Sequence, residues 1–404
     1  MKAVVFHGVG DIRLDNVPEP KIKESTDAIV RLTSSAICGT DLHFIRGTFP
    51  GMQEGTILGH EGVGVIEEVG NDVRNFSPGD RVVIPSTIGC GSCAYCRDGY
   101  YAQCDNANPN GKDAGTAFFG GPQGTGPIQG LQAEYARIPF ANVGLVRLPD
   151  NIIDEQAILL SDIFPTGYFG AHLAEIKHGD TVAVFGCGPV GIFAIISAHL
   201  FQAGRVIAVD CVESRLEIAR YHGAEVINFE KEDPVETIKS LTGGIGVDRV
   251  IDAVGVDALH PHRGTADENE KQKQQKYQQE QDKIIQEQNP QGDLWVPGDA
   301  PSQALRWSVQ AAAKAGTLSI IGVYPPQLDS FPIGQAMNKN LTINMGNCNH
   351  RRYLPQLVRL VNSGAVEPST VLTQEMPIVS AIEAYKSFDQ RQAGWMKVEL
   401  LATR

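Results

Sequence analysis

The sequence predicts an α/β fold in two parts, a strand-rich N-terminal part and a doubly wound parallel sheet. Short Val-rich segments separated by Gly and Pro turns fill about the first 160 residues, as in a strand-rich domain. Strand and helix patterns then alternate from Thr181 to Ile321, which is typical of a parallel sheet covered by helices on both faces. The length of 404 residues fits two domains.

Each element of the second part has its own local signal. β-branched runs predict strands, and amphipathic stretches followed by Gly predict helices. The predicted strands are Val182–Phe185, Arg205–Val209, Val226–Phe229, Val247–Ile251 and Thr317–Ile321. The predicted helices run from the Gly191 turn to about Gln202 before Gly204, over Leu216–His222, and from a Ser302 cap to Ala315 before Gly316.

Charge and hydropathy exclude some classes of partner. A net charge of −13 and an isoelectric point near 5.3 argue against nucleic acid or an anionic membrane, which both repel an acidic surface. The apolar run Ala3–Phe6 is too short for a secretory signal, so we expect a cytoplasmic protein. The uncharged run between Asp180 and Arg205 is interrupted by glycines and a proline, which favours buried α/β elements over a membrane span.

Four of the eight cysteines form a close cluster. They are spaced C-x2-C-x2-C-x7-C, which lets one loop surround a tetrahedral ion. An iron–sulfur cluster is the main alternative, but the ferredoxin pattern has a shorter last gap followed by Pro, so zinc is favoured. Four thiolates leave no open position for a substrate, and the predicted site is structural: Cys90, Cys93, Cys96 and Cys104.

A second metal site is suggested by two fragments, Ser35–His43 and Leu58–Gly64. They offer a thiolate, an imidazole and carboxylates, and catalytic zinc takes three protein ligands. Each fragment alone is also compatible with an ordinary buried Cys or His. The spacing therefore leaves a metal site and unrelated core residues both open.

The stretch Thr181–Gly191 reads as a dinucleotide fingerprint. A strand is followed by G-x-G-x-x-G, a helix and a second strand that ends in Asp210, nineteen residues after Gly191. Gly186 permits the tight turn, Gly188 lets the backbone approach a pyrophosphate, and Gly191 allows close helix–strand packing. Pro189 and Val190 open the helix, whose N-terminus favours phosphate. Since Asp210 would repel a 2′-phosphate, NAD is preferred over NADP.

One segment differs from the rest of the second part. Residues 266–289 are dominated by Gln, Glu, Asp and Lys, with Tyr277, Ile284 and Ile285 as the residues able to bury apolar surface. Such a composition cannot form its own core, so we expect a solvated helix or a mobile loop inserted in the nucleotide domain. A lid or a subunit contact is the functional alternative.

These motifs together resemble the medium-chain zinc-dependent alcohol dehydrogenases over essentially the whole chain, and more closely their formaldehyde-dehydrogenase-related branch. The matching stretches are Cys38–Asp41, Gly59–Gly64, the four-Cys lobe, Gln132–Tyr135, Leu160–Tyr168, Gly186–Gly191 and Ile320–Tyr324. The resemblance implies a GroES-like catalytic domain, residues 1–163 and 336–404, with a structural zinc lobe at about 88–106. It also implies a Rossmann domain, residues 164–335, carrying the polar insert at about 262–300.

The resemblance also assigns roles. Cys38, His60 and Asp162 are similar to the catalytic zinc ligands, and Glu61 to the carboxylate that can approach the metal. Thr40 would accept the substrate proton and His43 would pass it outward; an exposed surface imidazole is the alternative for His43. The implied cofactors are NAD and two zinc ions per chain, one catalytic and one structural. Implied NAD contacts are Thr166 at the nicotinamide, Val323 at its carboxamide, and Lys397 and Arg215 near the pyrophosphate and ribose.

The resemblance leaves the substrate less defined. Glutathione-dependent relatives use an arginine soon after the fourth lobe cysteine, whereas residues 105–136 here contain no Arg. We therefore expect hydride transfer between NAD and a small primary alcohol or aldehyde hydrate, with glutathione-independent formaldehyde oxidation among the candidates. The alternatives are an aldehyde dismutase that retains NAD, a polyol, sugar or threonine-type dehydrogenase, and a non-catalytic NAD-binding zinc protein. A homotetramer is expected, with a dimer as the alternative.

Overall fold

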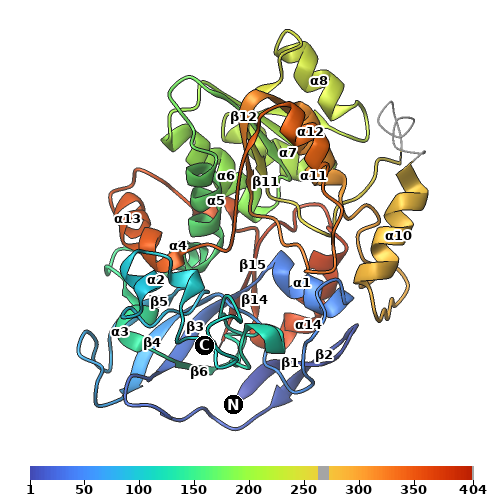
Figure 1. The fold of residues 1–404 in the computed structure, drawn as a ribbon. Coiled ribbons are helices and arrows are strands. Elements are labelled where there is room, and N and C mark those ends of the chain that lie inside the picture. Colours follow the sequence, from blue (N-terminus) through green and yellow to red (C-terminus); the bar gives the residue numbers. More distant parts are fainter. Residues whose placement is uncertain (263–272, 403–404) are drawn as a thin grey trace.

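The computed structural model describes residues 1–262 and 273–402, and it has a strand-rich part and a parallel-sheet part (Figure 1). The strand-rich part, in the lower half of the figure, is built on a sheet of order β14-β15-β3-β4-β5-β7, with β6 also paired to β3. Its strands are β1 (Lys2–Gly8), β2 (Asp11–Asn16), β3 (Ala28–Ile37), β4 (Gly62–Val69), β5 (Arg81–Ile84), β6 (Tyr135–Ile138), β7 (Val146–Arg147), β14 (Gln374–Pro377) and β15 (Val398–Leu401).

Helices of the strand-rich part lie around this sheet and toward the other part. α1 (Gly39–Arg46) follows β3 directly, and α4 (Asp154–Ser161) leads into α5 (Ile163–Leu173), which packs on the parallel-sheet part. The remaining helices here are α2 (Ala94–Arg97), α3 (Ala141–Gly144), α13 (His350–Asn362) and α14 (Ala381–Asp389). Because β14 and β15 come from the C-terminal end of the chain, both chain ends contribute to the strand-rich part.

The second part is a parallel sheet of order β10-β9-β8-β11-β12-β13. Alternate residues of β8 bury on opposite faces: Val182 and Val184 pack with α5, α6 and α7, while Ala183 and Phe185 pack with α8, α11 and α12. This two-sided burial confirms the doubly wound sheet. Its elements are β8 (Thr181–Phe185), α6 (Pro189–Leu200), β9 (Arg205–Asp210), α7 (Glu213–Tyr221), β10 (Glu225–Asn228), α8 (Pro234–Leu241), β11 (Val247–Asp252), α11 (Gln303–Ala311), β12 (Ala312–Ile320), α12 (Ile333–Asn338) and β13 (Thr342–Met345).

The end of one helix and the start of the next strand differ from the sequence prediction. The helix expected to reach Ala315 ends at Ala311, since the chain joins the sheet at Ala312, which pairs with Val247. Ser302 occupies the expected N-cap position but makes no capping hydrogen bond: its hydroxyl donates to Glu280 of the insert and accepts from Arg306 Nε. In addition, β13 extends the parallel sheet beyond residue 335, where the return to the catalytic domain was expected.

The polar insert contains a helix, α10 (Gln274–Ile284), which lies on the outside of the molecule beyond α11 (Figure 1). Tyr277 and Ile284 are buried as expected, and the Glu280 carboxylate is buried with them, where it contacts Ser302 and Arg306. The described part of the insert is therefore packed on the nucleotide domain rather than freely solvated. The first residues of the expected insert, 263–272, lie outside the described residues.

None of the described helices combines the length and the apolar content that crossing a bilayer requires. The apolar segment after Asp180 is divided between β8 and the twelve-residue helix α6, as the sequence predicted.

Candidate active site

Cys38, His60, Glu61 and Asp162 meet between the two parts of the molecule. One ligand atom from each lies within 4.8 Å of the others, and all four residues are buried. His60 Nε2 is 3.2 Å from Asp162 Oδ2, and Cys38 Sγ is 3.9 Å from the same oxygen. A thiolate, an imidazole and a carboxylate at this spacing form the donor set of a catalytic zinc site.

Asp41, at the start of α1, positions two of these groups. Its Oδ2 accepts hydrogen bonds from the Cys38 amide at 3.0 Å and from the Gln132 side chain at 3.3 Å, while its Oδ1 lies 3.2 Å from His60 Nδ1. A carboxylate on Nδ1 turns Nε2 of the imidazole toward a metal, which is the usual support for a zinc-binding histidine. This contact explains the Asp of the Cys38–Asp41 motif.

Asp162 sits at the break between α4 and α5. Ser161 fixes the end of α4, because its hydroxyl accepts from the Gly62 amide at 3.0 Å and donates to the Ile84 carbonyl at 2.5 Å. Asp162 Oδ1 accepts a hydrogen bond from the Thr166 hydroxyl at 2.8 Å and contacts His350 Nε2 at 2.6 Å. With Oδ1 held in this way, Oδ2 faces Cys38 and His60 as the free ligand atom.

Glu61 and Lys397 form a fully buried ion pair beside this cluster. Lys397 Nζ lies 2.5 Å from Glu61 Oε1 and 3.0 Å from the Ile37 carbonyl. Glu61 Oε2 is buried without a hydrogen-bond partner among the described residues. An unsatisfied buried carboxylate oxygen is costly, so this atom fits a position from which it approaches a metal ion.

The electrostatics of the cluster follow from burial. Burial raises the pKa of the Cys38 thiol, although the neighbouring His60 acts against it. Burial also acts to raise the pKa of Asp162, but hydrogen bonds from His350 and His60 outweigh it and hold that pKa well below its ordinary value. For Lys397, burial acts to lower the pKa, but the charge of Glu61 raises it above the ordinary value. A divalent cation compensates buried anionic donors of this kind, and its binding releases the thiol proton.

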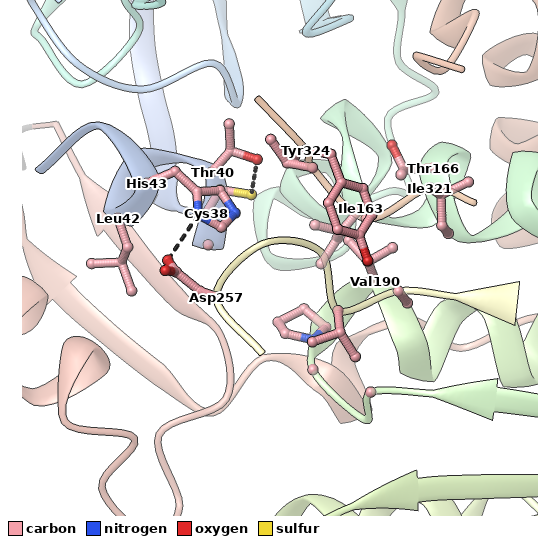
Figure 2. A pocket seen from close by; sticks show the side chains of 18 of the residues that line it. Cys38, Thr40, Leu42, His43, Ile163, Thr166, Val190, Asp257, Ile321 and Tyr324 are labelled. Atoms are coloured by element: carbon pink, nitrogen blue, oxygen red, sulfur yellow. Dashed lines mark hydrogen bonds and ion pairs between the residues drawn. The ribbon is translucent and has the colours of Figure 1, made fainter. Parts of the chain in front are cut away.

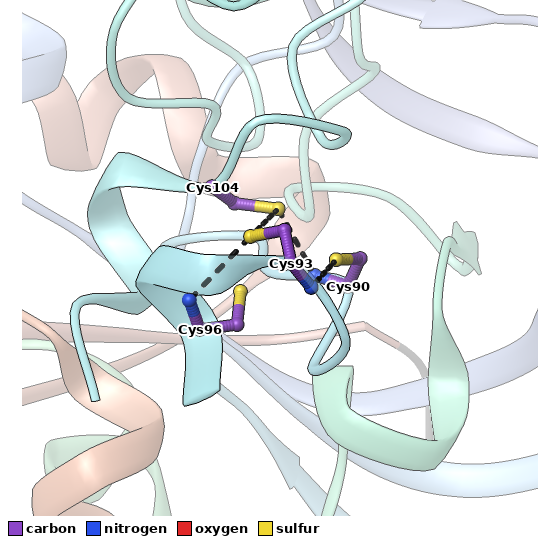
Figure 3. A group of neighbouring side chains, drawn as sticks. All are labelled: Cys90, Cys93, Cys96 and Cys104. Carbon is purple, nitrogen blue, oxygen red and sulfur yellow. Dashed lines mark hydrogen bonds between the residues drawn. The ribbon is translucent and has the colours of Figure 1, made fainter. Parts of the chain in front are cut away.

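The four lobe cysteines converge as predicted (Figure 3). Their sulfur atoms lie within 4.8 Å of one another, and backbone amides point at them, such as the Cys90 amide at 3.2 Å from Cys104 Sγ. Although burial acts to raise the pKa of Cys90, hydrogen bonds from Ser92, Cys93 and Asn106 lower it to about 6. Such N–H···S contacts favour thiolates, so the lobe fits a structural zinc ion.

A cavity of about 680 Å³ joins the metal-ligand cluster to the glycine-rich turn. Figure 2 shows Cys38 and His43 on one side of it and Thr166 and Val190 on the other. The lining includes residues from both parts of the chain, which is where ligands of doubly wound folds bind. The metal cluster and the predicted nucleotide turn therefore share one space.

The glycine-rich turn has the geometry that its sequence predicts. Gly186 has a φ of +91°, and a Cβ on Gly191 would lie 1.8 Å from the Gly186 carbonyl oxygen. By contrast, a Cβ on Gly188 would meet nothing nearer than the Arg215 guanidinium at 4.0 Å. Gly188 thus leaves the cavity side open for a bound phosphate. Pro189 and Val190 begin α6 and line the same cavity.

Asp210, at the end of β9, lines the cavity with its carboxylate oriented by three backbone amides. Oδ2 accepts from the Cys187 amide at 2.7 Å, and Oδ1 accepts from the Cys211 and Val212 amides at 2.7 and 2.9 Å. A charged acceptor fixed in this way suits ribose hydroxyls. Its contact with the cofactor stays a prediction.

His43 is buried in the cavity wall, which excludes the exposed imidazole considered from the sequence. Its Nδ1 contacts Asp257 Oδ2 at 2.8 Å and the Thr48 hydroxyl at 3.2 Å (Figure 2 marks the first contact). Thr40 also lines the cavity, with its hydroxyl 3.8 Å from Cys38 Sγ. Both residues thus line the cavity, and their roles in proton transfer stay predictions.

The other predicted cofactor contacts all line the cavity: Thr166, Arg215, Val323 and Lys397. The Val323 carbonyl is already engaged by the Val256 amide, and the Lys397 ammonium by Glu61, so their roles toward a cofactor stay predictions.

Sequence reasoning missed three residues of this site. His350 contacts Asp162, Asp257 contacts His43, and Arg391 brings a half-buried cationic side chain to the cavity wall. Asp257 follows β11 at the carboxyl edge of the sheet, a position that could have marked it. His350 and Arg391 lie in segments without a motif.

The comparisons with known proteins agree with this geometry. Residues 24–150 match the family model "Alcohol dehydrogenase GroES-like domain", and residues 189–261 match "Zinc-binding dehydrogenase". The chain is 39% identical to the uncharacterized zinc-type alcohol dehydrogenase-like protein AdhB of Bacillus subtilis, over 99% of this chain and 100% of AdhB. It is 32% identical to a glutathione-independent formaldehyde dehydrogenase of Pseudomonas aeruginosa, over 97% and 95% of the two chains.

A solved structure gives the same result. The alcohol dehydrogenase TADH from Thermus sp. ATN1 superposes with a TM-score of 0.79 at 33% identity, covering 99% of each chain. Zinc and NAD are accordingly the expected cofactors, and both predicted zinc sites have suitable donors. The chain belongs to the medium-chain zinc-dependent alcohol dehydrogenase family.

Proposed function

We propose that this oxidoreductase transfers hydride between NAD and small primary alcohols or aldehyde hydrates, including formaldehyde without glutathione. One observation carries the proposal: the Cys38, His60 and Asp162 donors share a single cavity with the glycine-rich turn and Asp210. This arrangement supports a substrate oxygen at the metal and a nicotinamide within reach of the substrate carbon.

In this proposal the protein's own groups bind and orient the substrate and move its hydroxyl proton. When bound, zinc supplies Lewis acidity at the substrate oxygen and NAD supplies the hydride acceptor. In this proposal the Thr40 hydroxyl accepts the substrate's hydroxyl proton, and His43, which lines the same cavity, acts as the neighbouring acid–base group. Asp257 holds the imidazole of His43 at 2.8 Å and thereby fixes its orientation.

The substrate end of the cavity favours a small apolar group. Phe118 packs edge-on against the His60 ring, with centroids 6.1 Å apart, and stacks on Phe44 at the same separation. Both phenyl rings line the cavity. Aromatic walls beside the metal ligands suit an alkyl or hydrogen substituent better than the hydroxyl-rich chain of a polyol or sugar.

The segment after the fourth lobe cysteine supports independence from glutathione. Ala114, Gly115 and Thr116 of this segment line the cavity, and none carries a charge. The one basic side chain between residues 105 and 136, Lys112, is exposed. A glutathione adduct would need a cationic partner for its carboxylates, which this segment does not bring to the cavity.

A second candidate, aldehyde dismutation with retained NAD, is favoured by the return segment of the insert, residues 285–299. Within it, Asn289 donates to the Val9 carbonyl at 3.1 Å, and the Trp295 amide donates to Asp389 at 2.8 Å. The Gly298 amide donates to Asp257 Oδ1 at 3.0 Å. This segment links the nucleotide domain to the catalytic domain beside the cavity, which would slow cofactor exchange.

The test uses zinc-replete enzyme with NAD and a panel of primary alcohols, aldehydes and polyols. We expect NADH formation with small alcohols, and formaldehyde oxidation at a rate that glutathione does not change. Equal amounts of alcohol and acid without net NADH would select the dismutase. Turnover confined to polyols, or absent from the whole panel, would contradict the proposal. Asp162→Asn serves as the control that loses any activity due to the metal site.

The expected homotetramer, with a dimer as the alternative, rests on the family resemblance alone, and light scattering of the purified enzyme tests it. The cytoplasmic location expected from the N-terminal sequence also stays a prediction.

A further inference from the structure

His260, His262 and Asp299 form a third group of potential metal ligands among the described residues. The two histidines lie in the loop after β11, and Asp299 lies just before α11. These positions are the two ends of the segment that carries the polar insert. The group shares no residue with the catalytic cluster or with the cysteine lobe.

The spacing within this group matches that of the catalytic cluster. His260 Nδ1 lies 2.7 Å and His262 Nε2 lies 3.8 Å from Asp299 Oδ2, and one ligand atom from each residue lies within 4.8 Å of the others. At the catalytic cluster, the corresponding contacts to Asp162 Oδ2 are 3.2 and 3.9 Å. One carboxylate oxygen therefore faces two potential ligand atoms in both places: two imidazole nitrogens here, and one imidazole nitrogen and one sulfur at the catalytic cluster.

Backbone hydrogen bonds hold the ligands in this arrangement. The His260 amide donates to Asp299 Oδ1 at 2.9 Å, which leaves Oδ2 for the imidazoles. The His262 amide donates to both oxygens of Glu230, at 3.1 and 3.3 Å, and so fixes the second histidine to the loop after β10. Support of this kind orients ligands before a metal binds.

The two imidazole rings lie side by side. Their centroids are 4.3 Å apart at an angle of 65°. The distance of 3.8 Å from His262 Nε2 to the carboxylate is too long for a hydrogen bond. An ion between the three groups would satisfy this nitrogen, and the 55% exposure of the His262 side chain leaves room for water ligands.

We propose that His260, His262 and Asp299 bind a third divalent metal ion, from the late first-row series that includes Zn²⁺ and Ni²⁺. Two imidazoles and one carboxylate are a preferred donor set for these ions, whereas Ca²⁺ and Mg²⁺ prefer oxygen ligands alone. The ion joins both ends of the insert-bearing segment. It thereby restrains the base of the insert and the helix α10 that packs on the nucleotide domain.

The test is a calorimetric titration with Ni²⁺ of full-length enzyme that holds two zinc ions per chain, so that the proposed third site is free at the start. The variants are His260→Ala/His262→Ala and Asp299→Asn, and the control is His178→Ala, which removes an exposed histidine elsewhere. We expect one additional equivalent in the parent and in the control. We expect it to be lost in the double variant and weakened by about 10–100-fold in Asp299→Asn. Cu²⁺ bound at the same site should show two nitrogen ligands in its electron paramagnetic resonance spectrum.

A second readout tests the structural consequence. Hydrogen exchange in α10 should slow when Ni²⁺ is added to the parent, and should not change in the double variant. Binding that is equal in the parent and the double variant would assign the ion to an adventitious surface site and overturn the proposal. No additional equivalent in the parent would overturn it as well, and unchanged exchange in α10 on binding would refute the restraint of the insert.

Discussion

Asp257→Asn is the substitution that tests the proton-handling part of the site. The Asp257 carboxylate contacts His43 at 2.8 Å and the Arg46 guanidinium at 3.1 Å. Burial acts to raise the pKa of Asp257, but the charges of His43 and Arg46 hold it well below its ordinary value. Asp257 is therefore ionised throughout the working pH range, and the amide removes a charge that the native site always carries.

The expected losses of stability and of kcat follow from the contacts that remain in the variant. Removing one partner of a buried ion pair costs about 3–5 kcal/mol when the other charge is left alone. Arg46 keeps Asp389, at 2.7 and 2.8 Å, so we expect a loss of about 1–3 kcal/mol of stability. Positioned acid–base groups contribute about 10²–10⁴-fold to rate, and a misoriented His43 should lower kcat by about 10–100-fold.

The matched control is Asp389→Asn, which disturbs the same Arg46 guanidinium and leaves the His43 contact in place. We expect both variants to lose stability, and Asp257→Asn alone to lose kcat by the stated factor. In a His43→Gln background, Asp257→Asn should have little further effect on kcat. If the two single variants lower kcat equally, Asp257 acts on stability and does not position His43.

Three further predictions concern other parts of the chain. Burial raises the pKa of Glu399, which accepts the Ser34 hydroxyl, from 4.5 to about 7, so the folded state holds this proton more tightly than the unfolded chain. The cost of ionising this buried carboxyl lowers the stability of the folded state; it is absent below pH 4.5 and complete above pH 7. Glu399→Gln should therefore stabilise the enzyme by about 2–3 kcal/mol at pH 8 and by little at pH 4. Equal changes in Tm at both pH values would refute this. Asp210→Asn should weaken NAD binding by about tenfold and reduce the preference for NAD over NADP, because the ribose loses a charged acceptor. Fluorescence titration measures both affinities, and an unchanged affinity for NAD would show that Asp210 does not bind the ribose. Cys96→Ser should release one zinc ion per chain and lower Tm, since a structural zinc contributes folding energy; a full zinc content measured on the purified variant would speak against the four-sulfur site.

Local patterns carry most of what the sequence predicts about this fold. The turn from Gly186 to Gly191 is determined by residues next to one another, so its strand, helix and close packing follow from sequence alone. The cysteine lobe is local in the same sense, because one loop supplies all four sulfurs. The boundary between α11 and β12 was misjudged, since the pairing of Ala312 with Val247 overrides the helical preference of an Ala-rich stretch.

The contacts that support the site join residues far apart in the chain. His350 contacts Asp162, which is 188 residues away in the sequence, and Asp257 contacts His43, which is 214 residues away. Neither pair leaves a spacing pattern in the sequence. The catalytic ligands Cys38, His60 and Asp162 were assigned through resemblance to a family, because spacing alone left their convergence open. The burial of Tyr277 and Glu280 likewise depends on the surface that α11 offers, which the composition of the insert does not show.

The most direct test of the central claim is anomalous diffraction at the zinc edge from crystals of the enzyme with NAD. We predict a peak bonded to Cys38 Sγ at about 2.3 Å, to His60 Nε2 at about 2.0–2.1 Å and to Asp162 Oδ2 at about 2.0–2.2 Å, facing the nicotinamide. The claim is contradicted if these three side chains hold no zinc, or if the nicotinamide lies too far from the ion for hydride transfer to a substrate bound there.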